Sequence, residues 1–284
     1  MKGGVKVLFS AASAISAVKG FFMRRYLRLY FAFARNCFVR ELEYRLSFVL
    51  RAIGSAAEGI LPVAFIALVF RQVQAVAGWT VDQMLLLMGT YTLVEGTLST
   101  LFGANMAEIS RYVNRGELDL VLTKPVSSQF YVSTRLVAWE ALPRVVLGVG
   151  VTAHAFGRLN VPMKLETFLA YLALLGAGVA IGYSLWLMSV VWVFWTERLS
   201  NAGFVFYTFL ELGRVPIQAF QGVARLILTF VLPMAFMTTV PTEALMGVFS
   251  LERAATGALL AAAFLIASSL AWRAGLRSYA SASS

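Results

Sequence analysis

The chain has 284 residues, of which 60% are hydrophobic and 13% are charged, and its formal net charge is +10. Soluble domains average about 45–50% apolar and roughly 25% charged residues, so this chain has too few charged side chains to cover a soluble globule of its size. The composition excludes an ordinary soluble protein and predicts a polytopic membrane protein. The positive charge therefore does not by itself indicate binding of nucleic acid.

The residue types that carry catalysis are scarce. There is one cysteine, Cys37, and one histidine, His154, which is too few for a typical metal site of about three or four ligands. No segment reads GxxxxGK[ST], so the chain has no P-loop for ATP. We expect a protein that is not an enzyme, with no catalytic residue, metal or cofactor of its own, and membrane-embedded transferase chemistry is disfavoured on the same grounds.

Residues 1–19 imitate a signal peptide. Lys2 and Lys6 come before a weakly apolar run that is rich in Ala and Ser. A dense basic cluster follows directly and opposes export. We therefore expect an uncleaved cytoplasmic tail.

Residues 20–47 have the pattern of an amphipathic helix. At about 100° per residue, one face holds Arg24, Arg28 and Arg35, with Arg25 beside it, and the opposite face holds Tyr26, Tyr30, Phe33 and Cys37. We expect this helix to lie in the membrane interface, with its aromatic rings at headgroup level and its arginines near anionic lipid. It serves either as an anchor that fixes topology or as a sensor of lipid or of a partner.

A bilayer-crossing helix needs about 20 mostly apolar residues, and six segments of the chain qualify. We predict an all-α polytopic membrane protein with six transmembrane helices over residues 48–273, followed by a cytoplasmic tail over 274–284. The predicted spans are 48–70, 84–107, 136–156, 168–195, 217–240 and 254–272.

The basic residues gather on one side of these spans. Most of the 24 Lys and Arg residues precede the first span, follow the last, or lie in the second-to-third or fourth-to-fifth connection, where Arg198 and Arg214 are found. The positive-inside rule then places both termini in the cytoplasm.

Five ionisable side chains fall within or beside predicted spans, where an unpaired charge costs several kcal/mol: Glu58, Glu95, Glu140, Arg144 and Arg225. Glu140 and Arg144 are four residues apart, so we expect them to share a helix face and to pair. Glu58 and Glu95 have no cation in reach on their own helices. The five groups either neutralise one another or line a polar cavity or a seam between subunits, and Glu58 and Glu95 are the better candidates for the second role.

Small residues recur at helical spacing in two spans. Gly89, Gly96 and Gly103 are seven residues apart in the second span, and the fourth span carries Gly178 and Gly182. Such stripes let helix backbones approach closely. We expect tight packing there, and a substrate path along these helices is the alternative.

The connection over residues 108–135 is the longest between spans on the basic side. A helical alternation around Arg111 and Arg115 ends at Gly116, and a short amphipathic piece runs from Glu117 to Leu122 before Pro125. Such a segment either passes force from a soluble partner to the spans or is a passive loop.

The same connection resembles a known family. The run Arg115-Gly116-Glu117-Leu118-Asp119, followed by Leu122-Thr123-Lys124-Pro125, is similar to the G-x-L-D-x-x-L-x-K/R-P signature of ABC (ATP-binding-cassette) type-2 exporter permeases. The resemblance is closest to a branch with two paired permeases beside one ATPase, and it covers about residues 40–277. Val215-Pro216 stands where that branch commonly has Tyr-Pro.

The resemblance implies a division of labour between subunits in the bacterial plasma (inner) membrane. The helix over 20–47 would be an elbow helix, and a coupling helix at about 111–122 would contact a cytoplasmic ABC ATPase dimer that holds ATP and Mg. Two permeases, identical or paralogous, would enclose one export path, while this chain contacts membrane lipids and no nucleic acid. The residues that would couple to the ATPase are Arg111, Arg115, Gly116, Glu117, Leu118, Asp119, Leu122, Lys124 and Pro125.

An alternative function needs no ATPase. The chain would then be a membrane scaffold, or a secondary transporter that uses Glu58 and Glu95 as proton carriers.

Overall fold

The structure is a computed structural model that describes residues 24–196 and 202–279. It is 82% helical, with no strand in the described part, which confirms the predicted all-α class. The predicted tail over 1–19 and the first residues of the predicted elbow helix lie outside the described residues.

Four helices are long and apolar enough to cross a membrane, and the number rises to six if each of two bent helix pairs counts as one span. The second of the four is continuous over Val81–Asn114 and is therefore longer than the predicted span. It consists of α3, a π-helical turn η1 and α4. The four are α2 (Arg45–Val69), α3 (Val81–Leu98) with η1 (Ser99–Gly103) and α4 (Ala104–Asn114), α8 (Leu165–Val191) with η3 (Trp192–Phe194), and α12 (Leu251–Ser278).

The first bent pair contains the predicted third span. Its two parts meet at an angle of 55° across a short non-helical segment, residues 135–138. Pro143 lies in the first turn of the longer helix, where its missing N–H leaves no hydrogen bond unmade. The parts are α6 (Ser128–Thr134), then η2 (Trp139–Ala141) with α7 (Leu142–Arg158).

The second bent pair shows that the prediction of one helix over 217–240 is wrong. The segment forms two arms that are bent by 66°, with Pro233 at the break between them. Proline cannot donate to a helical hydrogen bond, which ends the first arm there. The pieces are η5 (Ile217–Ala219), α10 (Gly222–Leu226), η6 (Ile227–Val231), η7 (Ala235–Thr239) and α11 (Val240–Leu245).

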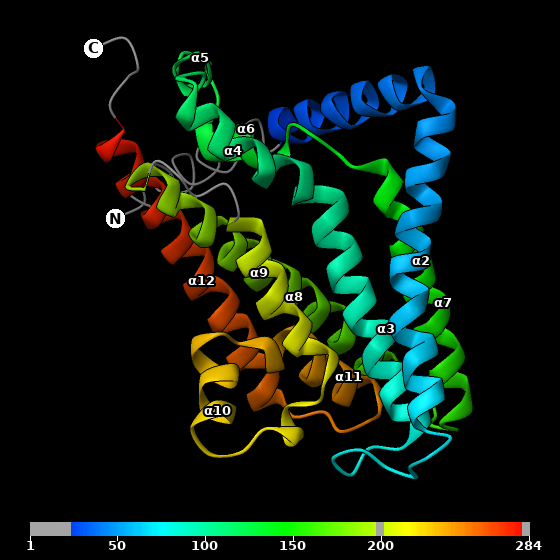
Figure 1. Cartoon of the computed structure of the whole chain (residues 1–284). Helices are drawn as coiled ribbons and strands as arrows, with labels where there is room; N and C mark the ends of the chain where they lie inside the picture. The colour runs from blue at the N-terminus through cyan, green and yellow to red at the C-terminus, as the bar shows by residue number, and fades with distance from the viewer. Residues whose placement is uncertain (1–23, 197–201, 280–284) are drawn as a thin grey trace, which may run out of the picture.

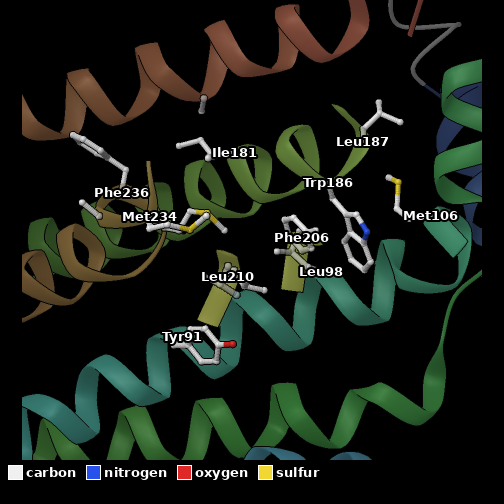
Figure 2. Packing of buried hydrophobic residues seen from close by; sticks show 14 of the residues in the cluster. Tyr91, Leu98, Met106, Ile181, Trp186, Leu187, Phe206, Leu210, Met234 and Phe236 are labelled. Atoms are coloured by element: carbon white, nitrogen blue, oxygen red, sulfur yellow. The ribbon is translucent and has the colours of Figure 1, made fainter. Parts of the chain in front are cut away.

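A helix that the sequence did not predict lies before this pair. The ten residues of α9 (Ala202–Glu211), followed by η4 (Leu212–Arg214), fall in the predicted fourth-to-fifth connection. Phe206 of α9 stacks on Trp186 of α8, with ring centroids 4.6 Å apart, and Leu210 is fully buried. Figure 2 shows both α9 side chains in the apolar core between α3 and α8.

The two ends of the helix bundle differ (Figure 1). One end, called the α5 end here, carries the N-terminal helix over residues 24–43, which runs across the top of α2, together with the tip formed by α5 (Leu118–Leu122). The other end, called the α10 end, carries α10 and the loop between α2 and α3.

Glycines bring α3 and α7 into close contact, as the sequence predicts for Gly89 and Gly96. A Cβ at Gly89 would lie 2.7 Å from the backbone nitrogen of Thr152, and one at Gly96 would lie 3.0 Å from that of Val145. Gly178 and Gly182 of α8 are also tightly packed, whereas Gly103 has only ordinary contacts. These distances support the packing interpretation of the glycine stripes.

Candidate functional site

A cavity with a volume of about 590 Å³ lies between α2, α3, α7 and α9. Apolar and aromatic side chains form part of its wall. Five charged side chains also line it: Glu58, Glu95, Arg144, Glu211 and Arg214.

Arg144 of α7 holds three helices together in this cavity. Its guanidinium donates to Glu95 of α3 and, at 2.5 Å, to Glu58 of α2. Its Nε donates to the Ser55 hydroxyl at 3.2 Å, and the Ser99 hydroxyl donates to the same Glu95 oxygen at 3.0 Å. Glu58 and Glu95 have no cation in reach on their own helices, and the structure shows that Arg144 of α7 supplies it to both.

The predicted pairing of Glu140 with Arg144 is wrong. Glu140 lies in the 3₁₀ turn η2, which precedes α7, so the two residues are not one α-helical turn apart on a regular helix. Its carboxylate instead lies 3.6 Å from the guanidinium of Arg51, on α2.

Glu211 and Arg214 form a second charged pair in the cavity, which the sequence analysis missed. Their side chains are 3.2 Å apart, and the Arg214 guanidinium lies 5.1 Å from the ring centroid of Tyr91, on α3. Arg214, which the sequence analysis assigned to the fourth-to-fifth connection, thus lines the cavity beside Tyr91. The sequence did contain a signal for this pair, because Glu211 and Arg214 have the i, i+3 spacing of a helical ion pair and follow the apolar residues of α9. That apolar run is shorter than a membrane span, so a search for spans does not find it.

The cavity is incompletely covered by this chain. Glu58 lies near the middle of α2, and 68% of its side chain is exposed. A carboxylate at the middle of a membrane helix normally faces protein or water rather than lipid, because its transfer into hydrocarbon is costly. The three acids and two arginines also leave one acidic group in excess.

The predicted coupling segment forms two short helices joined by a turn. The first, α4, ends at Asn114, and Gly116 has a φ of +70°, which glycine adopts without strain. The second, α5, buries Leu118 and Val121 and leaves Leu120 and Leu122 exposed. The predicted break at Gly116 is confirmed, although α4 continues the spanning helix and does not lie alone on the membrane surface.

Several charged residues of this segment contact one another or nearby rings. Arg111 pairs with Glu108 and lies 3.8 Å from Glu117, while the Lys124 ammonium lies 5.4 Å from the Tyr131 ring centroid. Arg115 is exposed, and Asp119 is partly buried.

The N-terminal helix uses its aromatic face for contacts with the rest of the chain. Tyr26 packs edge-on against Phe130, with centroids 4.7 Å apart, and Cys37 is buried. A separate exposed stripe of Leu27, Phe31, Phe38 and Leu42 remains for lipid. Arg24, Arg28 and Arg35 are exposed as expected, and Arg25 donates to the Pro125 carbonyl at 2.9 Å.

A polar clamp joins α4 to the segment between α6 and η2, which leads into α7. The side chain of Asn105 is buried and makes two hydrogen bonds with the Leu136 backbone: it donates to the carbonyl at 2.6 Å and accepts from the N–H at 2.8 Å. In the π-helical turn, the Thr100 carbonyl accepts from the Ala138 N–H at 2.9 Å. Movement of α4 would therefore be passed to the chain that leads to Arg144.

Long apolar helices with a charged cavity between them define a multi-pass membrane protein. Residues 59–283 match the model of the ABC-2 family of transporter proteins, and the chain belongs to that family. It is thus a permease subunit of an ABC transporter. No curated protein and no solved structure matches the chain significantly.

Proposed function

We propose that this permease works in an ATP-driven exporter, with a second permease beside it and a separate ATPase dimer docked on the α5 end. The observation that carries the proposal is the continuous helix over Val81–Asn114. It contains Tyr91 and Glu95 of the cavity and reaches the turn before α5. At 1.5 Å per residue, the part from Glu95 to Asn114 is roughly 28 Å long.

This helix is suited to passing a displacement from the α5 tip to the cavity. A push on α5 moves α4, and the Asn105 clamp carries α7 with it. Arg144 on α7 would then shift relative to Glu58 on α2, which opens or closes the cavity. Transport would follow from a change between two packed arrangements of the same helices.

A second permease accounts for the exposure of Glu58. In this arrangement the cavity of one permease would form half of an enclosed path. Leu61 and Phe204, which line the cavity, are exposed apolar side chains and would be covered by lipid or by the second subunit. A second subunit, identical or paralogous, would bury the carboxylate away from lipid.

The remaining assignments follow from this arrangement. ATP and Mg would be bound by the ATPase subunits, and this chain supplies only the coupling surface. The basic residues of the N-terminal helix and of the 108–135 segment gather at the α5 end, which favours a cytoplasmic location for that end and for both termini in the bacterial inner membrane.

The ATP-independent alternative is disfavoured, because Arg144 already pairs with both glutamates that would carry protons.

Leu120→Glu tests the coupling surface. This side chain is 68% exposed on α5, so its replacement leaves the fold of the chain intact but places a charge in the proposed apolar contact. We expect loss of the associated P-loop ATPase and a fall of at least about tenfold in ATP hydrolysis by the affinity-purified complex. Val248→Glu, a similarly exposed residue at the α10 end, is the control and should change neither. Equal ATPase activity in the two variants would contradict the proposal.

Asn105→Ala tests the mechanical link. The change leaves both backbone groups of Leu136 without their partner, so we expect a loss of about 1–3 kcal/mol in stability and a lower ratio of substrate transported to ATP hydrolysed. Binding of the ATPase should persist, because α5 is untouched. An unchanged ratio in inverted vesicles would show that the clamp does not transmit the movement.

A further inference from the structure

A second cavity lies at the α10 end, away from the charged cavity described above. Its volume is about 390 Å³, and its walls come from both arms of the bent pair and from the start of α12. The apex of the pair contributes apolar side chains, whereas the charged residues lie farther along the arms and on α12: Arg225, Glu243 and Arg253.

The charges of this cavity do not cancel. Both oxygens of Glu243 are engaged, one by the Gln218 amide and the other by the Arg253 guanidinium, each at 2.6 Å. In the described part of the chain no acidic side chain pairs with Arg225. The cavity therefore carries one positive charge in excess.

The surroundings of Arg225 suit a molecule that is anionic at one end and apolar at the other. Leu226 and Phe230 line the cavity on the same arm, and both are more than half exposed. Arg225, Leu226 and Phe230 therefore line one and the same cavity. The buried Gln218 Oε1 has no hydrogen-bond partner among the described residues, so it offers an acceptor to a hydroxyl.

We propose that this cavity binds one anionic phospholipid, with its phosphate on Arg225 and an acyl chain along Leu226 and Phe230. The excess positive charge selects a lipid with net negative charge over a zwitterionic one. The adjoining apolar wall favours a lipid over a free phosphate, because only a lipid removes that wall from water. The site lies at the end of the bundle where α7 ends and α12 begins, the level at which headgroups meet a spanning protein.

Photo-crosslinking of the full-length protein in phosphatidylcholine nanodiscs tests the site. The probe is phosphatidylglycerol with a photoactivatable group near the headgroup, and the matched probe is phosphatidylcholine with the same group. We expect about tenfold more labelling of peptides from 217–253 by the phosphatidylglycerol probe, the size expected for one charge-assisted hydrogen bond. Equal labelling by the two probes would overturn the proposal, and this comparison uses the unaltered protein.

Variants and a soluble competitor complete the test. Arg225→Gln should remove the preference and Arg225→Lys should keep most of it, while Arg158→Gln, an exposed arginine at the same end that pairs with Asp82 at 2.9 Å, should have no effect. A preference that survives in Arg225→Gln contradicts the assignment. If glycerol phosphate in the buffer displaces the probe as well as unlabelled phosphatidylglycerol does, the site binds a soluble anion and the lipid proposal is wrong. The result does not depend on the ATPase or on the second permease.

Discussion

Arg144→Met is expected to lower the free energy of unfolding by about 3–5 kcal/mol, the range for a buried ion pair that loses one partner. The guanidinium links α2, α3 and α7, and its loss leaves Glu95, whose side chain is only 8% exposed, without a cation. Glu58 contributes less to the loss, because it is more exposed. Denaturant unfolding of the purified protein in mild detergent measures the change.

Two further variants separate charge compensation from lost packing. Arg51→Met is the control, since Arg51 is half-exposed and pairs with Glu41 and Glu140; a change of about 1 kcal/mol or less is expected there. Adding Glu58→Gln and Glu95→Gln to Arg144→Met should restore much of the stability, because neutral amides cost less to bury than carboxylates. If the triple variant is no more stable than Arg144→Met alone, the cluster is not held by its charges.

Gly148→Ala is expected to destabilise the protein by about 1–3 kcal/mol, the usual cost of overpacking. A Cβ at this position of α7 would lie 2.7 Å from the backbone nitrogen of Leu93 and 3.1 Å from its Cα. Those atoms belong to the α3 backbone and cannot move aside as a flexible side chain could. The two helices would have to separate, which also disturbs the cavity between them.

Gly150→Ala provides a matched control on the same helix. A Cβ there meets nothing within 4 Å, so the substitution should be neutral or raise stability by up to about 1 kcal/mol through better helix propensity. Thermal unfolding of both variants in one detergent compares them directly. A similar loss of stability in both would mean that α3 and α7 are not in close contact.

Local features of the sequence were sufficient to predict several parts of the fold. A long apolar run forms a helix in a membrane because its backbone groups must be satisfied within the segment, and α2, α8 and α12 accordingly lie where their hydropathy places them. The break at Gly116 also follows from one residue, whose positive φ ends a helix.

The bent pair and α9 could not be found in this way. A window of about 20 residues joins the pieces around Pro233 into one apparent span and overlooks the ten residues of α9. Neither the arms of the bent pair nor α9 are long enough to be stable as isolated helices. Each is held by neighbours that are distant in sequence, as the stacking of Phe206 on Trp186 shows.

The sequence by itself determined that this protein lies in a membrane, which side of it is basic, and the family to which the 108–135 segment points. Only the tertiary structure decided which charges meet: Arg144 pairs with Glu58 and Glu95 on other helices, while Glu140 pairs with Arg51. The physical reason is that burial of an apolar helix depends on its own side chains, whereas an ion pair depends on which helices pack together. The close approach of α3 and α7 at their glycines places Arg144 beside Glu95.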